Sequence, residues 1–438
     1  MMHRSLFYIL LALIVALVSS VPVCAQSSTG PNTQSSSSGQ TTTGRLHGLI
    51  GERELSNVPD DVGYQLHESD ESIDSIFPYG PLTPLNDLWG RSTKRVNESL
   101  RLDLGLNYTA VYQTADTSAR GPREVSGGDF DFFGRWHLTG REDDWPGSLV
   151  FSSETRHRMS STSPNKLDTG TVGGTIVGFG VQDFSLVQLY WEQGSFEDGL
   201  MMRAGKIDPA LIYDGGRYVS SNYAFLSPAF ADTTPMPLPG AGIGMAGAIY
   251  PTDSTYLVAG LHDANGQRTT SGLSTFFDDA EYFSAVELGW FPNENEIDEG
   301  SYHITLWHID ARKRVGRRSD QGVALTMEQQ VGSDGQFVPF LRYAYADRGL
   351  NGIRENLSVG IGLEGPFYQN YDLIGTAFSW QEPSDRGLGN QSVFETFYRF
   401  FITPHTHLTP DIQVVIDPSN APTKSSVTVF GLRIRTLY

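Results

Sequence analysis

The sequence predicts an all-β protein: a transmembrane antiparallel β-barrel of about 16 strands, preceded by an N-terminal signal peptide and a polar extension. Three observations predict it: an export-type N-terminus, apolar and polar residues that alternate through the body, and a last strand that ends on an aromatic residue. The averages hide this pattern. The net charge of −19 and the mean hydropathy of −0.26 suggest a soluble acidic protein, but alternating residues cancel in an average.

The N-terminus is predicted to direct export. Leu6–Val18 is an apolar run too short to span a bilayer, and the small residues that follow favour cleavage after Ala25. The single cysteine, Cys24, lies in this segment, and an acylated Cys24 is the disfavoured alternative because Val21–Val23 lacks the usual small residue. Cleavage removes Arg4, so the mature chain carries 30 basic and 50 acidic residues, a charge of −20, and no cysteine.

The extension at 26–95 has two parts. Gln26–Gly44 contains only Gln, Ser, Thr, Gly, Pro and Asn and is predicted to be a flexible tether. Glu52–Asp74 is acidic and is either mobile or a short helical piece. We therefore expect a signal peptide at 1–25, a tether with an acidic segment at 26–95, and a barrel domain at 96–438.

Alternation begins at Ser99–Tyr112, where leucines, tyrosines and an alanine share one face and polar residues the other. The same pattern recurs at Gly147–Arg156, Gly322–Gln330, Leu357–Glu364 and Leu408–Asp417, and no helical-period stretch of comparable length accompanies it. The 343 residues from 96 to 438 give roughly 21 residues per strand and connection for 16 strands, which suits an outer-membrane barrel. A soluble sandwich of this size would normally contain a linker.

The last stretch, Val427–Tyr438, is the sharpest local signal. One face carries Phe430, Leu432 and the terminal Tyr438, and the other carries Arg433 and Arg435. Arginines are costly against lipid but not in a wet lumen, so we expect both to point inward.

Other functions find little support. The acid excess argues against nucleic-acid binding. Gly242–Gly247 matches the dinucleotide-binding motif G-x-G-x-x-G, but no βαβ unit surrounds it. We therefore interpret these glycines as close-packed residues of a barrel strand. His405 with His407, and the acidic loop Glu294–Glu299, lack a defined ligand pattern. We predict no catalytic residues, no metal and no cofactor.

From about Leu186 onward the chain resembles the carbohydrate-selective outer-membrane porin family, OprB. The resemblance rests on short stretches in order: Leu189–Gln193, Arg203–Asp208, Leu226–Phe230, Pro237–Gly247, Ala259–Gly266, Glu287–Trp290, Gly300–Tyr302, Leu306–Asp310, Pro339–Tyr343, Glu395–Arg399, Leu408–Gln413 and Gly431–Arg433. The family usually has a Gly-Asp-Trp-Gly-Gly-like entry, which Asn86–Arg91 only approximates, and the extension has no counterpart. The resemblance implies a barrel of about 16 strands through which sugars diffuse across the Gram-negative outer membrane.

A sugar channel needs hydrogen-bonding groups and an aromatic surface rather than chemistry. The polar strand positions provide the predicted pore-lining residues: Tyr190, Glu192, Lys206, Asp208, Glu328, Arg342, Glu364, Glu395, Arg399, Asp411, Gln413, Arg433 and Arg435. For each, a generic wetted wall position is the competing interpretation, and the strand phase of Lys206 is ambiguous because Arg203 lies on the opposite face. The expected partners are sugar or polyol solutes, outer-membrane lipid and, through the strand Phe430–Tyr438, the barrel-assembly machinery, with a homotrimer left open.

Two alternatives remain at this stage. An outer-membrane barrel enzyme of the esterase or lipase type would share the fold but lacks a recognisable nucleophile motif. A secreted β-rich protein that binds or hydrolyses carbohydrate would share the signal peptide and the alternation, but its strands would pack on a soluble core.

Overall fold

The computed structural model describes residues 55–438 except 57, 71–72, 74, 79–82, 141–144, 197, 292–299, 333–335 and 368–370. The predicted signal peptide, the tether and the acidic loop Glu294–Glu299 lie outside these residues. Residues 43–438 form one compact unit, and the following description concerns its described part.

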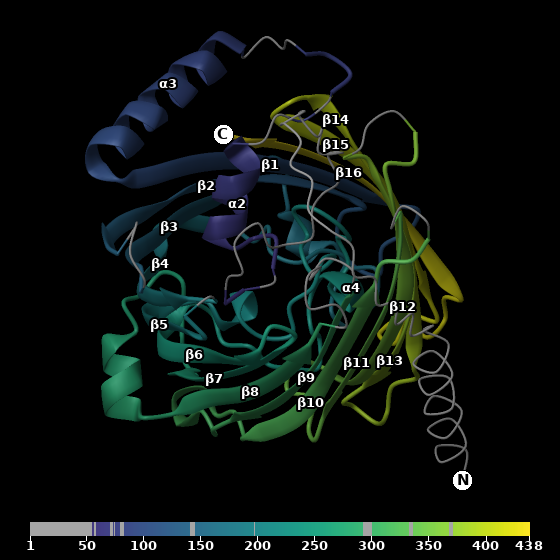
Figure 1. Ribbon diagram of the computed structural model, residues 1–438. Coiled ribbons are helices and arrows are strands. Elements are labelled where there is room, and N and C mark those ends of the chain that lie inside the picture. The colour runs from purple at the N-terminus through teal and green to yellow at the C-terminus, as the bar shows by residue number, and fades with distance from the viewer. Residues whose placement is uncertain are drawn as a thin grey trace, which may run out of the picture. The chain divides into compact units, whose positions relative to one another are not determined.

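Sixteen antiparallel strands close into one barrel, which confirms the predicted fold class (Figure 1). Each strand pairs with its neighbours in sequence, and β1 pairs with β16 to close the ring. The strands are β1 Leu102–Ala115, β2 Glu124–Thr139, β3 Gly147–Arg158, β4 Gln182–Ser195, β5 Leu200–Ile207, β6 Gly242–Thr252, β7 Thr255–Asp263, β8 Tyr282–Trp290, β9 Gly300–Ile309, β10 Asp320–Gln329, β11 Phe337–Ala346, β12 Ile353–Glu364, β13 Leu373–Pro383, β14 Gln391–Thr403, β15 Thr406–Ile416 and β16 Ser426–Leu437.

The described α-helices are α2 Val62–Asp70, α3 Thr83–Leu100 and α4 Pro228–Ala231. Short helical turns are η1 Pro164–Lys166, η2 Pro209–Leu211, η3 Thr275–Asp279 and η5 Lys313–Val315. None of the helices that the structure describes is long and apolar enough to cross a membrane.

The alternation of the sequence becomes an outside and an inside. On β16, Phe430 is 51% exposed whereas Arg433 is fully buried, as the alternation in this stretch predicts. Leu288 on β8 and Leu306 on β9 are likewise exposed, and their strand neighbours are buried. Apolar side chains therefore cover the outer face of the wall, and its polar side chains point inward.

The start of β1 differs from the expectation of a strand from Ser99. Helix α3 continues to Leu100, and Arg101 has a φ of 59°, the left-handed conformation in which helices commonly end. The Arg101 amide donates to the Asn97 carbonyl at 2.8 Å, which closes the last turn of the helix. The amphipathic spacing of α3 is legible in the sequence but was not predicted, because Pro84 and Gly90 weaken the helical signal.

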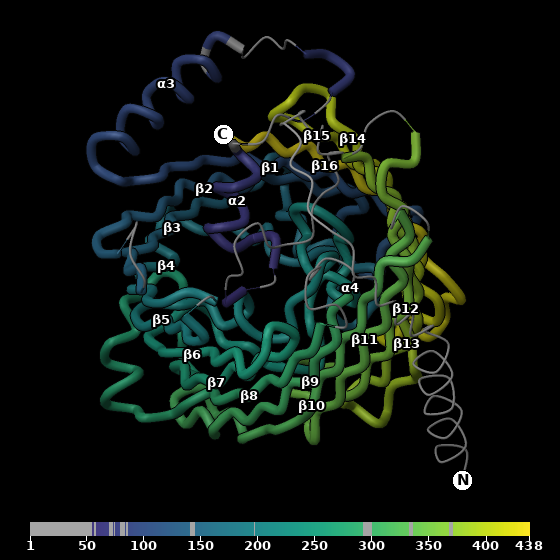
Figure 2. Tube along the Cα trace, viewed as in Figure 1, coloured from purple at the N-terminus to yellow at the C-terminus, as the bar shows by residue number. Residues whose placement is uncertain are grey.

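The two ends of the barrel differ in their connections. At one end, here called the loop end, residues 159–181, 208–241 and 264–281 join the strands. At the other, the turn end, β6 and β7 join through 253–254, β14 and β15 join through 404–405, and β1 begins where β16 finishes. Figure 2 shows that chain also runs inside the ring of strands, so the interior is not an empty cylinder.

Candidate functional site

The connection between β5 and β6, residues 208–241 and here called the inner loop, is fastened to the inside of the wall. Its Asp214 forms a buried ion pair with Arg342 of β11, with 2.7 Å between Nη2 and Oδ2. The Arg342 guanidinium also donates to the carbonyls of Phe230 at 2.7 Å and Asp232 at 3.2 Å. One wall arginine thus holds both the start and the middle of the inner loop.

Three predicted pore-lining glutamates are further anchors. Glu328 accepts from the Arg217 amide at 3.2 Å, and Glu364 pairs with the Arg217 guanidinium at 3.0 Å. Glu395 accepts from the amides of Leu226 at 2.5 Å and Ser227 at 3.0 Å. Glu328 and Glu395 thus satisfy backbone donors that would otherwise be buried without partners, and Glu364 compensates the charge of a loop arginine.

Two of the predicted arginines donate hydrogen bonds to backbone carbonyl groups of the inner loop. Arg433 donates to Ser221 at 2.5 Å and to Ala224 at 3.0 Å, and Arg399 donates to Tyr223 at 3.2 Å. Hydrogen bonds from a charged donor are stronger than those between neutral groups, so these buried arginines fix the loop to the wall.

The other predicted residues on β4, β15 and β16 are buried as well. Glu192 pairs with Arg203, and Tyr190 lies under the Arg203 guanidinium at 5.1 Å. Gln413 donates to Asp411 at 3.1 Å, and Arg435 donates to the Tyr223 hydroxyl at 3.0 Å.

Lys206 and Asp208 lie at the end of β5. Lys206 is the cross-strand partner of Leu189, which faces outward. The Lys206 ammonium donates to the carbonyls of Leu186 and Arg268, both at 2.7 Å. Asp208 caps the short helix η2 and pairs with Arg268. All thirteen predicted residues are thus buried, and their role toward a solute stays a prediction.

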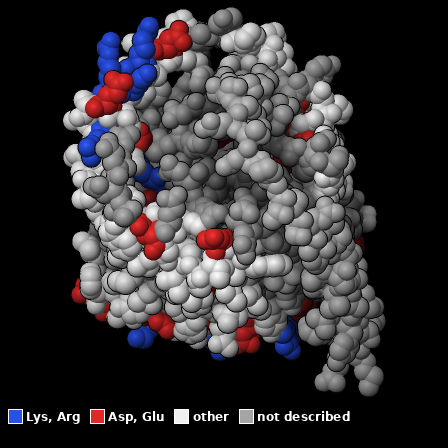
Figure 3. Space-filling view, in the orientation of Figure 1, with Lys and Arg blue, Asp and Glu red and all other residues white. Residues whose placement is uncertain are grey.

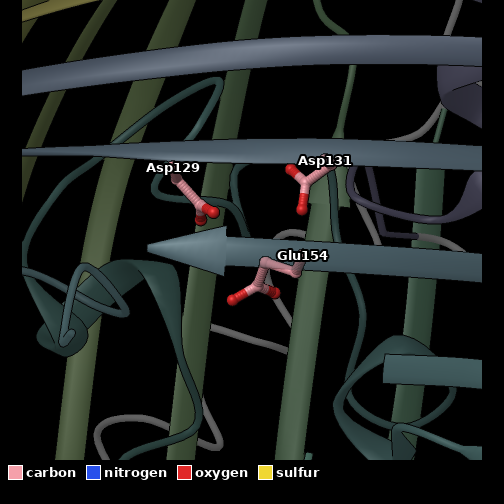
Figure 4. A group of neighbouring side chains, drawn as sticks. All are labelled: Asp129, Asp131 and Glu154. Carbon is pink, nitrogen blue, oxygen red and sulfur yellow. The ribbon is translucent and has the colours of Figure 1, made fainter. Parts of the chain in front are cut away.

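A group of charged side chains from β2, β3 and the connection between β7 and β8 is partly exposed through its cations. We call Asp129, Asp131, Glu154, Arg156 and Arg268 the charged cluster. The three carboxylates converge from the two strands, with ligand oxygens within 4.8 Å of one another (Figure 4). Asp129 and Glu154 both pair with Arg156, and Glu154 also pairs with Arg268 at 2.8 Å. Acceptors and donors therefore lie side by side, as in an ion-pair network.

The cluster is the part of the site that sequence reasoning missed. The spacing of Asp129 and Asp131 between outward Phe130 and Phe132 is a readable inward signal. Arg268 carried no signal, because it belongs to the connection between β7 and β8 and reaches the wall only through folding. Its side chain is 31% exposed, so it is the most accessible cation of the cluster.

Neighbouring charges shift the pKa values of two groups in the connections between strands. Burial alone would lower the pKa of Arg268, but the carboxylates of Glu154 and Asp208 raise it above its ordinary value. Burial would raise the pKa of Asp214, but Arg342 and a hydrogen bond from His303 hold it well below its ordinary value. Both groups therefore remain charged at physiological pH.

Comparisons with known proteins agree with this architecture. The family described as "Carbohydrate-selective porin, OprB family" matches residues 150–438. Porin AaxA of Chlamydia abortus is 24% identical over 68% of this chain and 67% of its own length, and that of Chlamydia felis is 24% identical over 68% of both.

Among solved structures, the high-pH structure of Pseudomonas putida OprB covers 80% of this chain and 97% of its own, with 15% identity and a TM-score of 0.61. A mutant Rh. blastica porin covers 77% of this chain and 100% of its own, with 9% identity and a TM-score of 0.51. At these identities, the two structures support the fold alone.

Proposed function

Because the chain belongs to the carbohydrate-selective porin (OprB) family, we propose that it is a passive channel of the Gram-negative outer membrane for sugars or related polyols. The observation that carries this proposal is that the family match spans the wall from β3 to the C-terminus together with the whole inner loop. The matched part therefore includes most of β3, all of β4 to β16 and the inner loop, whereas β1 and β2 lie outside it.

The path we propose for the solute runs past the charged cluster. Its carboxylates accept hydrogen bonds from sugar hydroxyls, and Arg156 and Arg268 donate to them. Because each cation is already paired with a carboxylate, a hydroxyl exchanges one partner for another and binds weakly. Weak binding suits a channel, since the solute must also leave.

The buried anchors have a different task in this proposal. They hold the inner loop against the wall, so that the width of the path is fixed by rigid contacts. Those of the predicted pore-lining residues that contact the inner loop then affect selectivity through its position; they are Glu328, Arg342, Glu364, Glu395, Arg399, Arg433 and Arg435. No reaction is assigned to the protein, and an esterase or lipase activity is the competing outcome.

We also propose how the protein meets its surroundings. Helix α3 lies outside the ring of strands beside β1, and at this place, at the upper left, Figure 3 shows basic side chains with acidic ones among them (Figures 1 and 3). The apolar residues Leu88, Trp89, Val96 and Leu100 recur at helical spacing, opposite Arg91, Lys94 and Arg95. A helix of this kind lies in a membrane interface, with its cations near anionic headgroups.

A contact between β2 and the end of α3 supports the placement of this helix at the membrane interface. Trp136 of β2, itself exposed, donates from its indole to the Leu100 carbonyl at 2.9 Å. Tryptophan and tyrosine at barrel rims mark the lipid interface. The strand Phe430–Tyr438 keeps apolar residues outward and ends on an aromatic, the pattern that we propose the barrel-assembly machinery recognises. A homotrimer would use part of the same outer face.

Planar-bilayer conductance tests the channel. Wild-type protein should conduct, and added glucose should reduce the current in a saturable manner. Arg268→Gln should weaken glucose block, whereas Arg314→Gln, at an exposed loop position 59% accessible, should not. Conduction without any sugar block would contradict the proposed selectivity, and ester hydrolysis by the same sample would favour the enzyme.

A further inference from the structure

A stretch of chain that precedes the barrel lies inside it. We call residues 55–56 and 58–70 the lumen segment; it includes α2. Figure 1 shows α2 within the ring of strands, below β1, while the longer α3 stays outside. This stretch belongs to the acidic part of the extension, for which the sequence suggested no role.

Its first anchor is an ion pair with the wall. Asp61 contacts Arg203 of β5 at 2.8 Å, and the Arg203 side chain is 1% exposed. Arg203 also pairs with Glu192 at 2.6 Å, and Glu192 in turn with Arg135 at 3.1 Å. Asp61 therefore adds a second carboxylate to a buried network of the wall.

Asp61 has a local task as well. It precedes α2, and its side chain accepts from the Gly63 amide at 3.1 Å, the position of a helix N-cap. The residue that starts the helix is thus also the residue that attaches it to β5.

The second anchor lies several strands away around the ring. Gln65 accepts from Asn107 of β1 at 2.7 Å and from Arg435 of β16 at 2.8 Å. Because β5 and the β16–β1 seam are different parts of the wall, the lumen segment bridges the interior between them.

Apolar contacts and the inner loop complete the fit. Leu55 and Val62 belong to the same buried cluster as Phe133 and Val150 of the wall. Toward the inner loop, Asn222 donates to Asp60 at 2.8 Å. The rings of Tyr64 and Tyr223 meet edge to face, with centroids 5.7 Å apart. The segment thus lies between the wall and the loop that narrows the pore.

The chain leaves the lumen at the turn end. The amides of Ile76 and Phe77 donate to the carbonyls of Phe401 at 3.1 Å and Ile402 at 2.9 Å, beside the turn between β14 and β15. Beyond this point the chain continues into α3. The lumen segment therefore has access to the interior from the turn end, without threading through the wall.

We propose that the lumen segment is a plug: docked, it obstructs the conduction path, and undocked toward the turn end, it opens it. The proposal rests on the channel function above. The segment carries carboxylates and meets wall arginines, and both sets of groups regain water when they separate in a wet lumen. Both ends of the inner loop continue directly into strands of the wall, whereas α3 separates the lumen segment from β1, so the lumen segment is the part of the interior that leaves first.

Deletion of residues 55–70 from the otherwise full chain is the direct test. The deletion should raise single-channel conductance and the rate at which sugars enter liposomes. Asp61→Asn retains a good N-cap but removes the charge, and it should raise the undocked-to-docked ratio on the order of tenfold. Asp253→Asn, in the exposed β6–β7 turn, is the matched charge control and should behave as wild type.

A reversible cross-link provides the opposite manipulation. Gln65→Cys and Asn107→Cys, in a chain with Cys24→Ser, can be joined by a short bifunctional methanethiosulfonate reagent. The cross-linked protein should stay in the low-conductance state, and dithiothreitol should restore openings. This experiment does not depend on the deletion variant folding, because the docked geometry is the native one.

The outcomes separate the plug from the channel. A wild-type channel blocked by glucose, together with unchanged conductance in the deletion and cross-linked proteins, overturns the plug alone. Higher conductance on deletion without any glucose block supports the plug and overturns the sugar selectivity. Silence in every folded variant overturns both.

Discussion

The pair between Arg342 and Asp214 offers the sharpest test of how the inner loop is held. Arg342→Met removes the guanidinium but keeps much of the volume. Asp214 then retains the hydroxyls of Thr326, at 2.8 Å, and Thr233, together with His303 at 3.3 Å, but it loses the guanidinium. Asp214→Asn removes the charge instead and leaves Arg342 with its carbonyl acceptors.

The expected magnitude follows from burial, since Arg342 is 5% and Asp214 2% exposed. Removing one partner of a buried ion pair costs about 3–5 kcal/mol of folding free energy, because the other charge is left uncompensated. Asp214→Asn should cost less, about 1–3 kcal/mol, since carbonyls still accept from the guanidinium. The double variant should be less destabilised than the sum of the two single variants, with a coupling of about 1–3 kcal/mol.

Reversible urea unfolding in short-chain lipid vesicles measures these free energies. Planar-bilayer recording measures how the position of the inner loop affects the current. Arg342→Met should also increase current noise, because a loosened inner loop changes the width of the path. The exposed pair Arg314–Asp279 is the control and should show less than about 1 kcal/mol of coupling. A cost below about 1 kcal/mol for Arg342→Met, or additivity within about 0.5 kcal/mol, would refute the reasoning.

Three further predictions concern the same loop. Glu395→Gln replaces one of two acceptors of loop amides by a donor, and it should cost about 1–3 kcal/mol in the same unfolding assay; an unchanged midpoint would contradict the anchoring role. Gly362→Ala places a Cβ 1.9 Å from the Tyr218 hydroxyl, so it should displace the loop and cost about 1–3 kcal/mol, whereas Gly389→Ala, with open space around it, should be nearly neutral. Burial raises the pKa of the Asp232 carboxyl from 3.8 to about 6, so its ionised form destabilises the fold above pH 6, and this penalty is lost as the pH falls toward 4. The free energy of unfolding of wild type should therefore rise relative to that of Asp232→Asn as the pH falls from about 7 to about 4. Parallel pH profiles of the two proteins would contradict this prediction.

The wall was predictable from the sequence because its signal is local. Each strand alternates within about ten residues, so the phase of Arg433 against Phe430 follows from neighbours alone. The glycines of Gly242–Gly247 illustrate the same point. They begin β6, and a Cβ on Gly244 would lie 2.5 Å from the His262 ring, so close packing explains a motif that resembles a nucleotide loop.

The interior was not predictable, because its contacts join distant residues. Arg342 meets Asp214 across more than a hundred positions, and Arg435 meets Gln65 across several hundred. The alternation of apolar and polar residues predicts that an arginine points inward. It does not predict whether that arginine contacts water, a sugar or another segment of the chain. The sequence therefore indicated the alternating wall of the barrel and could not indicate the partners of the residues on its inner face.

The distinction changes what the inward arginines imply about the pore. Arg399 and Arg433 point inward, yet each is buried and donates to carbonyl groups of the inner loop. A loop folded into a barrel must find partners for its own backbone groups, and arginine offers five donors in one side chain. Such residues shape the path without facing it. On the path proposed above, the field that a solute meets would be set instead by the more exposed cations Arg156 and Arg268 and by whether the acidic lumen segment is docked.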